Sequence, residues 1–274
     1  VEFALLAMEQ MIGTAAKAHY VSGGKHSVPL VVRMIVGRGW GQGPQHSQSL
    51  EAMFATVPGL KVVMPALAAD AKGMLLAAIE DDNPVLFIEH RWIHYARGNV
   101  PEAAEPAPLD GPRRIFDGGD VTVVGTSYMV LEAMRASEAL RDEGVGVDLF
   151  DLRVIRPLYM DKIIQSVKRT GRLVTVDTGQ ISFGIGAEIA ALVTQACFDE
   201  LKAAPRRIGL PDHPTPSSRA LAAAYYPTSG DIAAAAASLA GLEDAAVKRL
   251  KEALEKNRGE VPIDIPHPSF KGPF

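Results

Sequence analysis

The chain has 274 residues, of which 47% are apolar and 22% charged, and its formal net charge at pH 7 is −4. That length is enough for two domains of ordinary size. The weak negative charge argues against nucleic acid as a partner, no apolar run is long enough for a membrane span, and one cysteine excludes a disulfide within the chain. We therefore expect a soluble protein of a reducing compartment, the cytoplasm or, in a eukaryote, the mitochondrial matrix.

The first part of the chain, residues 1–98, alternates helix and strand patterns. Residues 1–20 carry apolar side chains at helical spacing and predict an amphipathic helix. The elements expected after it are a strand at 28–36, a helix at 47–55, a strand at 60–64, a helix at 68–80 and a strand at 84–89. Such alternation predicts a parallel sheet covered by helices on both faces.

A second part with the same alternation follows a segment at 99–119 that is rich in proline, glycine and acids and predicts a linker. Strands are expected at 121–125, 145–152, 172–177 and 206–210, and helices at 129–143, 161–167, 186–198 and 229–240. Residues 242–274 begin as a charged helix and end in a proline-rich tail that includes Pro262 and Pro266. The sequence predicts an α/β protein with two domains, 1–98 and 120–241, each with a parallel-type sheet flanked by helices.

The loop between the first expected strand and the next helix carries the main functional signal. Gly37, Gly39, Gly41 and Gly43 alternate with other residues, and the loop ends in Pro-Gln-His-Ser-Gln, which places His46 just before a helix. Glycine permits positive φ and a close approach to the backbone, and a histidine can move protons near neutral pH. His46 at this position indicates either a functional site or only a helix cap.

Four motifs in a fixed order resemble one family. They are Gly-Pro-Gln-His-Ser-Gln at 43–48, Pro-Gly-Leu-Lys-Val-Val at 58–63, Asp-Ala-Lys-Gly at 70–73 and Asp-Asn-Pro-Val at 82–85. Together they resemble the β subunit of the 2-oxo acid dehydrogenase E1 component, a transketolase-like family that uses thiamine diphosphate on pyruvate, branched-chain 2-oxo acids or acetoin. The resemblance implies a pyrimidine-binding domain, incomplete at its N-terminus, and a transketolase C-terminal domain.

The resemblance also implies roles for particular residues. His46 matches a histidine that handles the reaction intermediate or the lipoyl acceptor. Phe3 matches an aromatic residue that packs on the aminopyrimidine ring of the cofactor, although a phenylalanine on an amphipathic helix is also typical of a core. A possible potassium site, held mostly by backbone carbonyls, is implied at Leu30, Ala78, Ile79, Asp81 and Asn83.

Two parts of the family's active site are not found in the chain. The Gly-Asp-Gly motif that holds Mg²⁺ and the diphosphate is absent, so we expect an E1 α subunit to bring that half of the site. The segment that precedes the first helix in the family, with the glutamate that activates the cofactor, is also missing from this chain. The other expected partners are a second copy of the chain and the lipoyl acyltransferase, E2.

Alternative functions remain open on the sequence. A split transketolase or related synthase is one, although those enzymes have Gly-Pro-Thr-His-Gln at the histidine motif. A non-catalytic scaffold that has lost the activating glutamate is another. The run Glu89-His90-Arg91, with His94 nearby, follows a strand end, where it either contacts a substrate carboxylate or forms a solvated turn.

Overall fold

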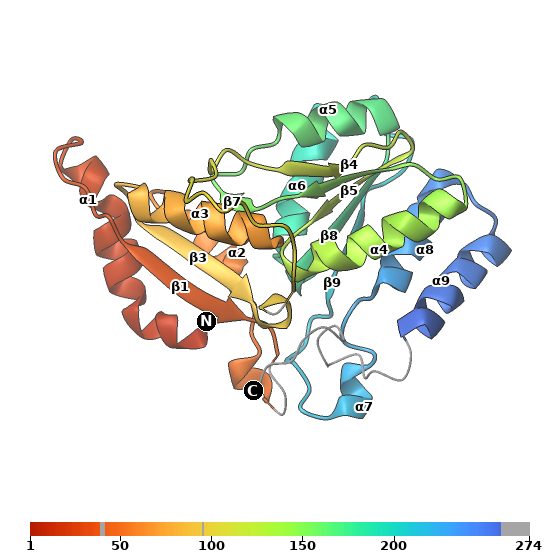
Figure 1. The fold of residues 1–274 in the computed structure, drawn as a ribbon, viewed down its shortest axis with the longest axis horizontal. Coiled ribbons are helices and arrows are strands. Elements are labelled where there is room, and N and C mark those ends of the chain that lie inside the picture. The colour runs from red at the N-terminus through yellow and green to blue at the C-terminus, as the bar shows by residue number, and fades with distance from the viewer. Residues whose placement is uncertain (39–41, 95, 259–274) are drawn as a thin grey trace.

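The computed structural model describes residues 1–38, 42–94 and 96–258, and it contains two sheets flanked by helices (Figure 1). The first sheet has the strand order β1-β3-β2-β7 and the second has the order β4-β6-β5-β8-β9. Most neighbouring strands run parallel. The predicted fold class is confirmed, whereas the glycines at 39 and 41 and the proline-rich tail lie outside the described residues.

The chain begins with three helical segments where the sequence predicted one regular amphipathic helix. They are the 3-10 helix η1 (Glu2–Ala7), the π-helix η2 (Glu9–Ala15) and the α-helix α1 (Ala16–Val21). The apolar side chains of this segment do not share one buried face: Met11 is buried, but Leu6 is 89% exposed. Because 3-10 and π-turns do not keep the spacing of an α-helix, apolar side chains spaced for a regular helix fall on different faces.

A tight turn holds this helical segment against the first sheet. Gly59 has φ +98°, and a Cβ atom at that position would lie 1.9 Å from the Ala16 carbonyl oxygen. The Lys17 ammonium donates a 2.6 Å hydrogen bond to the Pro58 carbonyl. The Pro-Gly-Leu motif therefore needs its glycine for backbone conformation and for a close approach to α1.

The first sheet draws strands from both parts of the chain. Its parallel strands are β1 (Val31–Val36), β3 (Val85–His90) and β2 (Lys61–Val63), and its helices are α2 (Glu51–Ala55) and α3 (Ala68–Glu80). The fourth strand, β7 (Val154–Arg156), pairs antiparallel with β2. The sequence did not predict β7, because so short a strand is recognised only by its pairing with a distant one.

The second sheet follows the predicted alternation closely. Its strands are β4 (Arg113–Phe116), β5 (Val121–Gly125), β6 (Val147–Asp151), β8 (Leu173–Gln180) and β9 (Arg206–Leu210). Its helices are α4 (Tyr128–Asp142), α5 (Asp161–Thr170), α6 (Ile185–Ala196), α7 (Arg219–Ala222), α8 (Ser229–Ala240) and α9 (Asp244–Arg258). β4 lies within the segment expected to be linker and pairs antiparallel with β6.

Apolar packing joins the two parts of the chain. One cluster of buried residues contains Val36 and Ile88 from the first sheet together with Phe150 and Ile155 from the second part. A contiguous core of this kind fixes the strand ends of the first sheet relative to the second part.

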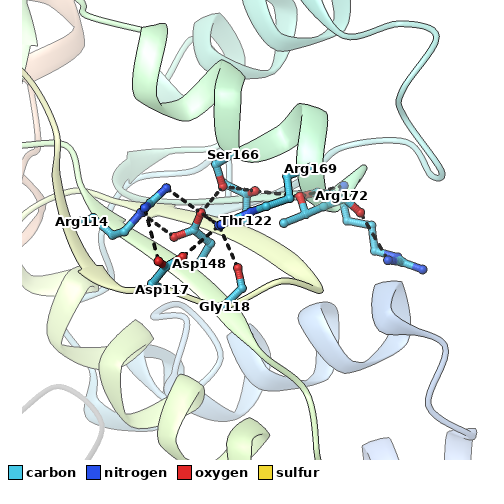
Figure 2. A network of polar contacts seen from close by, with 9 residues as sticks. Arg114, Asp117, Gly118, Thr122, Asp148, Ser166, Arg169 and Arg172 are labelled. Carbon is cyan, nitrogen blue, oxygen red and sulfur yellow. Dashed lines mark hydrogen bonds and ion pairs between the residues drawn. The ribbon is translucent and has the colours of Figure 1, made fainter.

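A buried aspartate organises one side of the second sheet (Figure 2). The Asp148 carboxylate on β6 is fully buried, and its oxygens lie 2.9 Å from Arg114 Nε and 2.5 Å from Arg169 Nη2. The Ser166 hydroxyl on α5 donates to it at 2.5 Å. Because two guanidinium groups and a hydroxyl surround this carboxylate, we assign the cluster a structural role.

Candidate functional site

The carboxyl ends of β1 and β3 lie side by side and form the floor of the candidate site. Val36 pairs with His90 in the parallel register, and the chain turns at Gly37 immediately after β1. Gly37 has φ +88°, and a Cβ atom there would lie 2.5 Å from His90 Nε2. The first glycine of the loop is therefore required by the histidine at the end of the neighbouring strand.

The structure brings His46 and Phe3 together. His46 ends the short 3-10 helix η3 (Pro44–His46), and its ring centroid is 5.6 Å from that of Phe3. The Phe3 side chain is 70% exposed. It is therefore not a core phenylalanine, and its ring and the imidazole form an open aromatic surface at the edge of the molecule.

Glu2 is a third member of this cluster that the sequence did not reveal. Its Oε1 atom lies 2.6 Å from His46 Nδ1. Burial acts to raise the pKa of Glu2, but its hydrogen bonds, first that with His46, lower the pKa overall, so the side chain is an anion at neutral pH. Only the folded arrangement shows this contact, because 44 positions separate the two residues.

The expected His90, Arg91 and His94 group divides into an interior and an exposed part. Burial, with help from His94 and Arg91, lowers the pKa of His90 to about 3, and its ring stacks on Tyr128 at 5.1 Å. His90 is thus a neutral interior residue rather than part of a solvated turn. Burial lowers the pKa of the half-buried Arg91, and the charge of Glu2 acts to raise it.

The second part of the chain holds the glycine loop in place. The Arg38 guanidinium is buried and donates a 2.5 Å hydrogen bond to the Ser217 carbonyl. The Trp92 indole N–H donates to the Arg38 carbonyl at 2.6 Å, and the Thr215 hydroxyl donates to the Ser47 carbonyl at 3.4 Å. Loop residues on both sides of His46 are therefore anchored to other parts of the protein.

Two buried acids, Glu51 and Asp177, lie close together near this loop. Glu51 begins α2, and its Oε1 accepts a 3.0 Å hydrogen bond from the Thr178 hydroxyl. Burial and the nearby Asp177 raise the pKa of Glu51 to about 8, and burial raises that of Asp177 as well. No sequence pattern indicated this pair, because an acid in a first helical turn is ordinarily exposed.

Another pair of acids joins the two parts of the chain. Asp70 at the start of α3 is buried, and its Oδ1 lies 3.0 Å from Arg153 Nη1 and 2.8 Å from Arg113 Nη2. Burial and the charge of Asp70 raise the pKa of Asp151 to about 8. The Asp-Ala-Lys-Gly motif thus has a structural purpose, since its aspartate binds arginines from the second part.

The residues of the possible potassium site surround the end of α3. Ala78 and Ile79 lie in its last turn, where carbonyl groups have no helical N–H partner. The Leu30 carbonyl accepts a hydrogen bond from the Val85 N–H at 2.8 Å and retains a second lone pair. These carbonyls fit a hard cation such as K⁺, which prefers oxygen ligands.

The Asp81 side chain departs from this expectation. Its carboxylate already binds the Lys61 ammonium, and its Oδ1 accepts the Asn83 backbone N–H at 2.9 Å. We therefore do not count the Asp81 carboxylate as a ligand. Within 1–38, 42–94 and 96–258, no group of three or more His, Cys, Asp and Glu side chains could hold a metal, and no helix is long and apolar enough to cross a membrane.

Both parts of the chain match models of known domain families. Residues 2–93 match the model of the transketolase pyrimidine-binding domain, and residues 113–232 match that of the transketolase C-terminal domain. A solved structure described as a split-gene transketolase, inactive β4 tetramer, superimposes with a TM-score of 0.67 at 23% identity, covering 88% of this chain and 74% of that one. At that identity it shows the fold alone.

Curated relatives are more similar in sequence. The β subunit of the acetoin:2,6-dichlorophenolindophenol oxidoreductase of Cupriavidus necator is 40% identical over 236 residues, which are 86% of this chain and 70% of the relative. The pyruvate dehydrogenase E1 β subunit of Rickettsia felis is 40% identical over 84% of this chain and 71% of its own. The mitochondrial pyruvate dehydrogenase E1 β-1 subunit of Arabidopsis thaliana is 40% identical over 84% and 64%.

Proposed function

The chain belongs to the transketolase-like family of pyruvate and acetoin dehydrogenase E1 β subunits, and we propose that it acts with an α subunit to decarboxylate a 2-oxo acid on thiamine diphosphate and to pass the acyl group to the lipoyl domain of E2. The single observation that carries the proposal is the pairing of His46 with the exposed Phe3 ring, at a centroid distance of 5.6 Å, beside the carboxyl ends of β1 and β3.

The residues around Phe3 and His46 fit the aminopyrimidine half of thiamine diphosphate. The exposed Phe3 ring offers a flat apolar face on which the aminopyrimidine would stack. Bound thiamine diphosphate would supply the site that accepts the electrons released when carbon dioxide leaves a 2-oxo acid. Because the described residues contain no acidic cluster for Mg²⁺, the α subunit would bring the Mg²⁺ and diphosphate half.

His46 and Arg91 would act on the reacting groups. His46, with 48% of its side chain exposed, can take a proton from the hydroxyl group of the reacting carbon or give one to a lipoyl sulfur. Arg91 lies within the field of the same cluster, and a guanidinium group suits a carboxylate such as that of a 2-oxo acid. Gly37 and the anchored loop hold these side chains at the strand ends.

Two further features support the assembly that we propose. The carbonyls of Leu30, Ala78 and Ile79 would hold a structural K⁺ ion next to β3. Large apolar side chains remain exposed, among them Leu6 at 89% and Phe183 at 96%. Surface of this kind is typical of a subunit that meets other chains, here the α subunit and a second copy of itself. The assembled protein would work in the cytoplasm or a mitochondrial matrix.

Reconstitution tests the proposal directly. The full-length gene product is combined with its α subunit, Mg²⁺ and thiamine diphosphate, and is given pyruvate, branched-chain 2-oxo acids and acetoin in turn. We expect reduction of 2,6-dichlorophenolindophenol with one of these substrates, and acylation of a free lipoyl domain when that substrate is a 2-oxo acid. The chain without its α subunit should show neither activity.

The alternatives give different results in the same assay. A split transketolase transfers a ketol group between sugar phosphates and does not acylate a lipoyl domain. A scaffold binds the α subunit without supporting either reaction, and the gene then encodes no glutamate upstream that could activate the cofactor. Either result contradicts the proposed function.

A further inference from the structure

The contact between Glu2 and His46 determines which imidazole nitrogen faces the reaction. Glu2 Oε1 lies 2.6 Å from Nδ1, and no more than 18% of the Glu2 side chain is exposed. The His46 ring itself is 48% exposed. The carboxylate therefore meets the ring on its sheltered edge, and the solvent-facing part of the ring is left for a substrate.

The ionised carboxylate constrains the histidine chemically. A carboxylate without a proton only accepts hydrogen bonds, so the nitrogen that faces it carries the hydrogen. In the neutral ring the other nitrogen, Nε2, then has the free lone pair. A neutral histidine side chain in water favours the opposite form, with the hydrogen on Nε2, so the contact reverses the usual preference.

Resting on the function proposed above, we infer that Glu2 is a positioning residue that holds His46 in its Nδ1–H form and so presents Nε2 as the proton acceptor for the acyl-transfer step. In that step one sulfur of the lipoyl disulfide would bond to the carbon left by decarboxylation while the S–S bond breaks, and Nε2 would take the hydroxyl proton of that carbon as its carbonyl forms and the acyl group leaves the cofactor. The resulting imidazolium is stabilised by Glu2, and it returns the proton to the second lipoyl sulfur. This role differs from that of the activating glutamate, which the resemblance places before Val1.

The simpler explanation is a surface ion pair with no consequence for chemistry. Exposed pairs contribute only about 0–1 kcal/mol, so stability alone does not separate the two explanations. The tautomer does, because a surface pair that forms only part of the time leaves the Nε2–H form populated in the folded protein, whereas a firmly held pair excludes it. The partial burial of Glu2 and the oxygen-to-Nδ1 distance favour the positioning role.

Nitrogen NMR on the full chain labelled at histidine tests this inference without any assay of activity. The seven histidines are distinguished by comparing spectra with that of His46→Gln. At a pH where the ring is neutral, we expect the ¹⁵N shift of an unprotonated nitrogen at Nε2 of His46. Glu2→Gln should move that signal to Nδ1, because an amide can donate to it. Glu9→Gln, an exposed glutamate of η2, is the matched control and should change nothing.

Kinetics of the reconstituted complex give a second readout. Glu2→Gln should slow lipoyl acylation about 10–100-fold, the cost typical of losing a carboxylate that orients a metal-binding histidine, with thiamine diphosphate affinity unchanged. Glu2→Asp, which keeps the acceptor, should recover part of the rate. An unprotonated Nδ1 in the unmutated chain, or equal acylation by the Gln and unmutated proteins, overturns the inference. If the unmutated complex has no activity but the tautomer responds as expected, the proposed function fails and the inferred contact stands.

Discussion

The edge that carries His46 and the interior cluster around Asp148 use similar charged groups in opposite ways. At Asp148 the carboxylate is fully buried, and Arg114, Arg169 and Ser166 enclose it (Figure 2). At the edge, Glu2 holds one nitrogen of His46 and leaves the rest of a half-exposed ring open. A charged group enclosed by its partners contributes to the fold, whereas a cluster with an exposed side can still bind a ligand or a partner.

The largest effect is expected for His46 at the exposed edge. His46→Ala in the complete complex should slow acylation of a free lipoyl domain about 10²–10⁴-fold, the usual range for losing one acid–base group. Because the imidazole is half-exposed, its loss should change the free energy of unfolding by less than about 1 kcal/mol. The control is His26→Ala, an exposed histidine outside the cluster. A large fall in melting temperature with normal acylation would show that His46 is only a structural cap.

The Asp148 cluster should show the reverse pattern, a large loss of stability rather than a loss of activity. Asp148→Ala removes the partner of two arginines and should destabilise the fold by about 3 kcal/mol, the lower end for breaking a buried pair, because Arg114 and Arg169 are partly exposed and can turn to water. Asp117→Ala is a matched control, since Asp117 contacts the same two arginines from a position that is 62% exposed. It should cost less than about 1 kcal/mol. Chemical denaturation of both variants checks the difference, and equal losses contradict our assignment.

The third prediction concerns Gly59, where the chain packs against the helical segment that carries Glu2 and Phe3. Gly59→Ala places a methyl group where the Ala16 carbonyl oxygen lies, 1.9 Å away, and forces φ +98° on an alanine. We expect a loss of about 1–3 kcal/mol and a weaker site, since α1 continues the helical segment that carries Glu2 and Phe3. Gly144→Ala shares the positive φ, at +81°, but has nothing within 4 Å. It should cost about 1 kcal/mol without affecting catalysis, as measured by melting and lipoyl acylation.

The sequence predicts the elements that depend on local contacts and misses those that depend on contacts between distant residues. The helix at 68–80, the strands at 121–125 and 206–210 and the helix at 229–240 have the predicted bounds, because local spacing and turn residues define them. β4 and β7 escaped prediction because each is short and is defined by its pairing with a strand far away in the sequence.

The same distinction applies to the candidate site. His46 and Phe3 were expected from family motifs, and the structure places them together, although their roles stay predictions. Glu2 could not be found, since no local pattern links it to His46. The Asp81 carboxylate was expected to face a cation, and only the structure shows that Lys61 is already there.

The pH dependence of stability tests Glu51, a buried acid whose hydrogen bond comes from the Thr178 hydroxyl, whereas Asp148 binds arginines. The pKa of Glu51 is raised from 4.5 to about 8, so it keeps its proton in the folded protein and loses it on unfolding between those two pH values. The unfolded state then binds fewer protons, and the stability that Glu51 contributes falls as pH rises from about 4.5 to about 8. Glu51→Gln mimics the protonated form and should keep the hydrogen bond with Thr178, so it should match the unmutated protein near pH 4.5 and exceed it in stability by a margin that grows up to pH 8. Asp151, whose pKa is also raised to about 8, titrates in both proteins and cancels in the difference.

Urea unfolding across this pH range, with the exposed Glu138→Gln as control, measures the difference in stability between Glu51→Gln and the unmutated protein. A gap that stays constant with pH would mean that Glu51 is ionised in the folded protein and has a counter-charge, as Asp148 does.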